Sequence, residues 1–176
     1  MPALELLLND KLLGTISTET LSVVRVDVSG KYGDEGLARL WVDGRREVDP
    51  NVAEGVSFVS GLELQRGQRI SVKLLDAGSR AFSDKSELHG GGYYKPVGES
   101  YQLFFEIARR GEQLVATDEG ESGFIFSLVW VQSEPRRTSV QLSTYAMGSH
   151  PLVRTKRLRV EEHIQVGQSA HLRIDA

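Results

Sequence analysis

The chain has 176 residues, no cysteine and a formal net charge of −3. This length fits one ordinary domain or two small ones, and the lack of cysteine excludes disulfides, a thiolate nucleophile and a zinc–thiolate site. The mild acidity argues against a dedicated nucleic-acid-binding protein, which would carry a large basic excess. We expect no signal peptide and no membrane span, because polar residues interrupt the N-terminal segment and no apolar run approaches about 18 residues. A cytoplasmic protein is therefore expected.

The predicted elements, taken along the chain, are short strands separated by polar turns. Apolar and polar residues alternate with a period of two, which is the pattern of half-buried β-strands. The alternating apolar residues are Val24, Val26 and Val28, then Leu40 and Val42, then Ile70, Val72 and Leu74. The turns between such segments are Asn9-Asp10, Ser29-Gly30, Asp43-Gly44, Arg66-Gly67, Arg110-Gly111 and Val166-Gly167. Helical periodicity is not sustained: the nearest segment, 49–61, is interrupted by Gly55 and predicts at most a short turn of helix.

Segments 100 residues apart resemble each other, which predicts an internal duplication. Gly67-Gln68 matches Gly167-Gln168, and the strand that follows each pair has the same alternation. At the same offset, three apolar residues of the first half match three of the second half. These are Val24, Val26 and Val28, which match Phe124, Phe126 and Leu128.

The pattern as a whole predicts an all-β protein. We expect an antiparallel β-sandwich, or a partly open barrel, built from two similar β halves with a pseudo-twofold relation. The halves are residues 1–78 and 101–176, with about five strands each, and a Gly/Tyr-rich connecting loop spans residues 79–100. The halves either form two small domains or interlock as one sandwich. Interlocking is favoured because a half of about 75 residues buries little of its surface alone.

The run His89-Gly90-Gly91-Gly92 has the same sequence as the oxyanion-hole motif of lipase-type hydrolases. Such a hydrolase also needs a serine on a G-x-S-x-G elbow between a strand and a helix, and the nearest candidate, Ser122, has neither the spacing nor the context. Glycines that supply positive φ, next to tyrosines that pack their rings, explain the loop more simply. We therefore expect no enzyme. The remaining possibility for catalysis is a pair of carboxylates that are distant in the sequence and that only the fold brings together.

No cofactor and no metal ion is expected from the motifs. Glycine-rich phosphate-binding motifs are absent, and the acidic residues in the turns lack the calcium-loop spacing. The four histidines are spread along the chain without a ligand-type grouping, so each is interpreted as an ordinary surface or strand-edge residue. They are His89, His150, His163 and His171.

The densest positive segment contains Arg154, Lys156, Arg157 and Arg159. As a regular strand it would place Arg157 and Arg159 on one face and two cations on the other face as well. The residues of that other face would be Arg154, Lys156, Leu158 and Val160. Two interpretations remain open. The segment is either an edge strand that lysine and arginine protect from pairing with another chain, or a contact surface for an acidic protein partner.

The closing Val166-Gly167-Gln168 hairpin after a β meander resembles short bacterial β-rich proteins without an assigned activity, and the resemblance implies no chemistry.

By elimination we expect a non-catalytic protein-binding β module, such as a bacterial immunity or inhibitor protein against a cationic toxin, or an accessory of a secretion or phage system. The alternatives are a carbohydrate- or small-ligand-binding sandwich and a self-assembling structural component that forms homo-oligomers. We expect no nucleic-acid or membrane partner. The candidate binding residues are His89, Tyr93, Tyr94, Lys95, Tyr101, Arg154, Lys156 and Arg157.

Overall fold

The computed structural model describes residues 2–31, 38–49, 52–76, 102–108, 110–115, 122–147 and 154–175. These ranges contain twelve β-strands and no helix, and so no helix long and apolar enough to cross a membrane. The strands of the first half are β1 (Ala3–Leu8), β2 (Lys11–Ser17), β3 (Val23–Lys31), β4 (Ala38–Asp49), β5 (Val52–Leu64) and β6 (Arg69–Leu75). Those of the second half are β7 (Gln102–Ile107), β8 (Gln113–Val115), β9 (Gly123–Val131), β10 (Arg137–Met147), β11 (Arg154–Gln165) and β12 (Ser169–Asp175).

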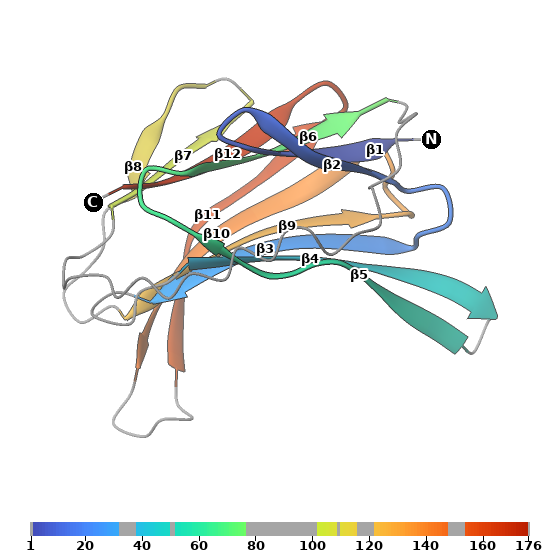
Figure 1. Ribbon diagram of the computed structural model, residues 1–176, viewed down its shortest axis with the longest axis horizontal. Coiled ribbons are helices and arrows are strands. Elements are labelled where there is room, and N and C mark those ends of the chain that lie inside the picture. The colour runs from blue at the N-terminus through green and yellow to red at the C-terminus, as the bar shows by residue number, and fades with distance from the viewer. Residues whose placement is uncertain are drawn as a thin grey trace.

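The strands form two six-stranded sheets in which every neighbouring pair is antiparallel. Sheet A has the order β2-β1-β6-β12-β7-β8, and sheet B has the order β11-β10-β9-β3-β4-β5. The two sheets lie over each other as layers (Figure 1). The prediction of an all-β antiparallel sandwich is therefore confirmed, although each half contributes six strands rather than about five.

The core lies between the two sheets and is built by the inward-facing residues of both. The predicted alternating residues are between 0% and 2% exposed: Val24, Val26, Val28, Leu40, Val42, Ile70, Val72 and Leu74. Their matches Phe124, Phe126 and Leu128 are fully buried in β9. Because successive side chains of a strand point to opposite faces, the residues between these core positions lie on the outer faces of the sheets.

The segment 49–61 is largely part of strand β5, and its described residues do not form even the short turn of helix that the pattern allowed. It pairs with β4 in a long hairpin, in which Gly55 lies opposite Arg45 and Ala53 opposite Glu47. A glycine interrupts a helix, yet a strand tolerates it where the neighbouring strand supplies the hydrogen bonds. The long pairing with β4 therefore decided the structure of this segment.

The strand order has the same form in both halves. Exchanging β1–β6 with β7–β12 leaves the order of both sheets unchanged, and each sheet contains three strands of each half. At the centre of sheet A, Ser71 lies opposite His171, and at the centre of sheet B, Asp27 lies opposite Ser127. The residues of each pair are 100 positions apart in the chain. This arrangement is what a twofold relation between the halves requires, while a common origin of the halves by duplication stays a prediction.

The two matched glycine turns also make matching contacts. Gly67 and Gly167 have φ angles of 79° and 88°, a region that favours glycine. The N–H of Gly67 donates to the carbonyl oxygen of Ile174 at 2.6 Å, and the N–H of Gly167 donates to that of Leu74 at 2.7 Å. Each turn thus binds the strand that follows the other turn, and together they hold β6 against β12.

Candidate functional site

The outer face of sheet A carries a cavity of about 530 Å³. It is lined from β1, from the β1–β2 turn and from the two central strands β6 and β12. The polar residues that line it include Glu5, Asp10, Ser71, Lys73, Ser169 and His171. Because the even-numbered residues of β6 and β12 are buried in the core, strand alternation turns the odd-numbered ones toward the cavity.

Strand register decides which of these residues meet. In the ladder between β6 and β12, Ser71 lies opposite His171, and Lys73 lies opposite Ser169. Glu5 of β1 lies opposite Lys73 on the other side. Side chains directly opposite one another in an antiparallel pair have Cβ atoms about 4.5–5.5 Å apart. The register therefore gathers hydroxyl, imidazole, ammonium and carboxylate groups in one small area.

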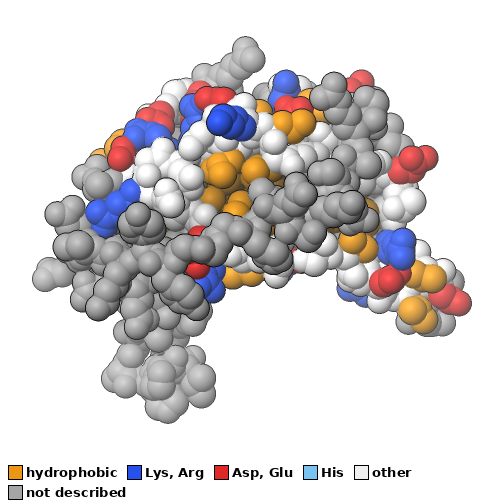
Figure 2. All heavy atoms as spheres, in the orientation of Figure 1, with side chains coloured by type: hydrophobic (Ala, Val, Ile, Leu, Met, Phe, Trp, Pro, Cys, Tyr) orange, Lys and Arg blue, Asp and Glu red, His pale blue; other side chains and the backbone are white. Residues whose placement is uncertain are grey.

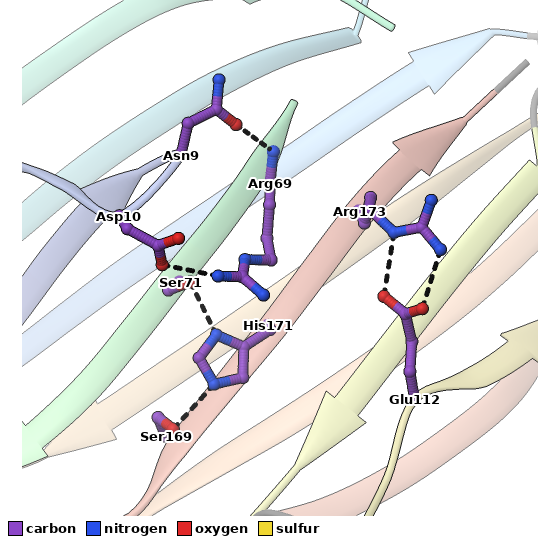
Figure 3. Close-up of polar contacts among 8 residues, drawn as sticks. All are labelled: Asn9, Asp10, Arg69, Ser71, Glu112, Ser169, His171 and Arg173. Atoms are coloured by element: carbon purple, nitrogen blue, oxygen red, sulfur yellow. Dashed lines mark hydrogen bonds and ion pairs between the residues drawn. The ribbon is translucent and has the colours of Figure 1, made fainter. Parts of the chain in front are cut away.

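His171 lies between two serines and is hydrogen-bonded to both (Figure 3). Its Nδ1 atom is 2.6 Å from Oγ of Ser71, and its Nε2 atom is 2.8 Å from Oγ of Ser169. Ser71 is buried, with 3% exposure, whereas Ser169 and His171 are half-buried and line the cavity. Both ring nitrogens are thus occupied, and the imidazole ring has one orientation.

Burial lowers the pKa of His171 below its ordinary value of about 6.5. The Arg69 guanidinium lowers this pKa further, whereas the carboxylates of Glu106 and Asp10 partly oppose the shift. The neutral form of His171 therefore predominates at pH 7, with one ring nitrogen that donates a hydrogen bond and one that accepts. A neutral imidazole between two hydroxyl groups can take a proton from one of them.

The β1–β2 turn is bound to the start of β6 beside this cluster. Asn9 and Asp10 have φ angles of 49° and 64°, as in a two-residue type I′ hairpin turn. The N–H of Asn9 donates to the carbonyl oxygen of Arg69 at 2.9 Å, and Oδ1 of Asn9 accepts from the N–H of Arg69 at 2.8 Å. The Arg69 guanidinium in turn pairs with Oδ1 of Asp10 at 2.5 Å (Figure 3).

Arg173, two residues after His171, belongs to a separate polar contact. Its Nε and Nη2 atoms donate to the two carboxylate oxygens of Glu112 at 2.9 and 2.7 Å (Figure 3). The guanidinium also lies 4.1 Å from the ring centroid of Phe104 and pairs with Asp175. The hydrogen bond from Arg173 lowers the pKa of Glu112. This contact holds the segment before β8 against β12.

A second feature of the surface is the end of the β4–β5 hairpin, which projects beyond the two sheets (Figure 1). We call residues 45–49 and 52–55 the arm; all of them are exposed. Val48 and Val52 near its tip are 62% and 55% exposed. An ion pair between Arg46 and Glu54, with Nη2 and Oε2 2.5 Å apart, links its two strands. Hydrophobic and charged side chains lie together on this projection (Figure 2).

The outer face of sheet B carries the polar pair of Asp27 and Ser127. Oγ of Ser127 donates to Oδ1 of Asp27 at 2.5 Å. Burial raises the pKa of Asp27 above its ordinary value of 3.8, although the Ser127 hydrogen bond and the nearby Arg25 guanidinium act in the opposite direction. Asp27 is therefore a partly buried carboxyl group whose ionised form is disfavoured by the fold.

The replacement Asp27→Asn should raise the Tm at pH 7 and change it little near pH 3. A carboxyl whose pKa is raised by folding binds its proton more tightly in the folded state, so the free energy of unfolding falls as the pH rises between the two pKa values. The amide removes this cost and still accepts from Ser127. Thermal unfolding at both pH values measures the effect, with exposed Glu19→Gln as the control. An equal gain at both pH values would contradict this account.

None of the predicted binding residues whose side chains are described lines the cavity. Five of them lie outside the described residues: His89, Tyr93, Tyr94, Lys95 and Tyr101. Arg154 belongs to β11, and its side chain also lies outside the described residues. Lys156 and Arg157 are exposed on β11, an edge strand of sheet B, whereas the cavity is on sheet A.

The predicted alternation of the basic segment is wrong at its centre. The register between β10 and β11 skips Arg159, so that Leu158 and Val160 lie opposite consecutive residues of β10. Such a one-residue bulge reverses the alternation, and Lys156 and Val160 therefore do not share a face. The bulge directs Nε of Arg159 to Oγ1 of Thr144, at 2.9 Å.

Sequence reasoning missed the cluster around His171, which it interpreted as an ordinary residue. One signal could have found it. Ser71 and His171 occupy matching positions of two similar segments, and strand alternation turns both outward. The pairing of β6 with β12 makes them neighbours, and nothing local in either segment reveals that pairing.

The fold and the site define an antiparallel β-sandwich with a polar cavity on one outer face and a projecting hairpin. Within the described ranges, no group of three or more histidine, aspartate or glutamate residues is placed to hold a metal ion. Comparison with protein-family models, with curated proteins and with solved structures finds no match to this chain. Proposals about function therefore depend on the geometry of the chain itself.

Proposed function

We propose that the protein is a protein-binding module and that the arm is its contact element. The observation that carries this proposal is the exposure of Val48 and Val52, 62% and 55%, at the tip of a hairpin that projects from the sandwich. A two-stranded ribbon without further packing is at best marginally stable in water. A partner that covers the tip would bury both valines and order the ribbon.

The contacts within the arm do not explain its length. The Arg46–Glu54 ion pair is exposed on both sides, and such pairs contribute about 0–1 kcal/mol. Burying a valine side chain against a partner contributes more, about 1.5–3 kcal/mol. The arm also carries Arg45, Glu47 and Asp49, so exposed side chains of both charges lie along the strands that hold the two valines.

The finer proposal is a bacterial cytoplasmic immunity or inhibitor protein, or an accessory of a secretion or phage system. Its support is the mildly acidic charge of −3, which suits a cationic protein partner. A self-assembling component is the alternative in which the arm contacts a second copy of the chain. A carbohydrate-binding role for Tyr93, Tyr94 and Tyr101 stays a prediction, because these residues lie outside the described ranges.

The proposal is tested by photo-crosslinking in cells that produce the protein. A photoreactive amino acid at position 48 should yield a discrete adduct, whereas the same group at exposed position 19 should not. The mass of the adduct separates a different protein from a second copy of the chain. Absence of an adduct at position 48 would contradict the proposal.

The double replacement Val48→Ser with Val52→Ser should weaken binding of the crosslinked partner roughly 10- to 100-fold. Because the valines are already partly buried in the free protein, their further burial contributes about 2–3 kcal/mol together, and about 1.4 kcal/mol corresponds to a factor of ten. Titration calorimetry with the purified partner measures this loss. Both valines are exposed in the free protein, so its own free energy of unfolding should change by less than about 0.5 kcal/mol. Unchanged affinity would exclude the tip as the contact.

A further inference from the structure

The hydrogen-bonded series Ser71–His171–Ser169 lies on sheet A, whereas the arm belongs to sheet B, and the proposed function leaves it unexplained. A neutral imidazole has one N–H and one lone pair, so one serine accepts a hydrogen bond from the ring and the other donates one. The serine that donates to the lone pair is the one whose hydroxyl can lose its proton to the ring.

Both serines line the cavity, but they differ in exposure. Ser71 is 3% exposed and is hydrogen-bonded to Nδ1 of His171, so it can hold the imidazole in place. Ser169 is half-buried and lines the cavity next to His171, so a small molecule in the cavity can reach its hydroxyl. The reactive tautomer is the one in which Nδ1 of His171 carries the hydrogen and donates it to Ser71. Nε2 is then free to accept from Ser169.

We propose that Ser169 is a nucleophile toward small carboxylic esters, with His171 as its general base and Ser71 as a positioning residue. The Oγ atom of Ser169 forms a bond to the ester carbonyl carbon, and its proton passes to Nε2 of His171. The bond from that carbon to the alkoxy oxygen then breaks, and the alcohol leaves with this proton. Water attacks the acyl-Ser169 ester, gives a proton to His171 and releases the carboxylic acid, after which the proton returns to Oγ.

One charged residue of the cavity, Lys73, favours this step. Lys73 lies directly opposite Ser169 in the ladder and lines the same cavity, so its ammonium group can stabilise the negative oxygen that forms during attack. In a serine–histidine–aspartate triad a carboxylate orients the ring, whereas a serine hydroxyl does so here. A neutral hydroxyl stabilises the imidazolium less than a carboxylate does. The site therefore suits activated esters better than amides.

The pH dependence of the reaction should follow His171. The fraction of His171 in its base form rises as the pH increases through its pKa, which burial lowers, so the midpoint of the rate profile should lie below about 6.5. The charged groups that face His171 come from every neighbouring element. They are Glu106 of β7, Arg69 and Lys73 of β6, Glu5 of β1 and Asp10 of the β1–β2 turn.

The experiment treats the full chain with a fluorophosphonate, which phosphonylates base-activated serines with loss of fluoride, and locates the adduct by intact mass and peptide mapping. We expect a single adduct on Ser169, no adduct in Ser169→Ala, and a rate about 100-fold lower in His171→Gln. The matched controls are Ser60→Ala and His163→Gln, which remove an exposed serine and an exposed histidine on sheet B. Both should react like the original chain.

The positioning role of Ser71 is read from the pH profile and from a conservative rescue. Ser71→Ala should lower the labelling rate and move the midpoint of its pH profile, whereas Ser71→Thr, which keeps the hydroxyl, should restore both. An adduct at another residue, no adduct at all, or a profile whose midpoint lies above about 6.5 would overturn the proposal. Mapping the adduct in the chain without substitutions tests whether Ser169 is the nucleophile, even where a variant folds poorly.

Discussion

Gly123→Ala should lower the free energy of unfolding by about 3 kcal/mol, because the added methyl group has no space. A Cβ atom at this position would overlap with the carbonyl oxygen of Gly30 and would lie 2.5 Å from Oη of Tyr145. The oxygen belongs to the backbone of β3, which pairs with β9 at the centre of sheet B. Relief of the clash would therefore require the central ladder of the sandwich to move.

The matched control for this prediction is Gly55→Ala in the arm. A Cβ atom there meets nothing within 4 Å, so the replacement should change the free energy of unfolding by no more than about 0.5 kcal/mol. Urea unfolding of the original chain and of both variants measures the difference. A similar loss in the two variants would show that the close approach of β3 and β9 at Gly123 is not what limits this position.

Phe126→Ala should cost about 3–5 kcal/mol, the usual range for removal of a buried phenylalanine side chain. Phe126 is fully buried in β9, between Val28 of β3 and Leu142 of β10. The cost combines the lost burial of the ring with the cavity that remains. Because domains of this size are stable by about 5–15 kcal/mol, the variant should lose a large part of its free energy of unfolding.

Thermal and urea unfolding measure this second loss, with Leu114→Ala of β8 as the control. Leu114 is 57% exposed, so its truncation should change the free energy of unfolding by about 0.5 kcal/mol or less. A small effect of Phe126→Ala, comparable with that of Leu114→Ala, would mean that the region around Phe126 does not form the centre of the core.

Local pattern predicted the strands of the core because the alternation of side chains is a property of the strand itself. Val24, Val26 and Val28 show it within five residues, and the structure buries all three. The matched turns at Gly67 and Gly167 could also be predicted from the sequence, since a positive φ angle favours glycine locally. The strand around Gly55 was not predicted, because its pairing with β4 in the hairpin, and not the residue pattern of the segment itself, makes it a strand.

The sequence by itself determined the all-β class, the faces that form the core and the likeness of the two halves, because period-two alternation and glycine turns act over a few residues. Only the tertiary structure decided that Ser71, His171 and Ser169 meet over a cavity, and that Asp27 meets Ser127. Those neighbours come from the register between central strands about 100 residues apart in the chain. Register is set by the packing of both sheets together, and a one-residue slip would turn every one of these side chains to the opposite face.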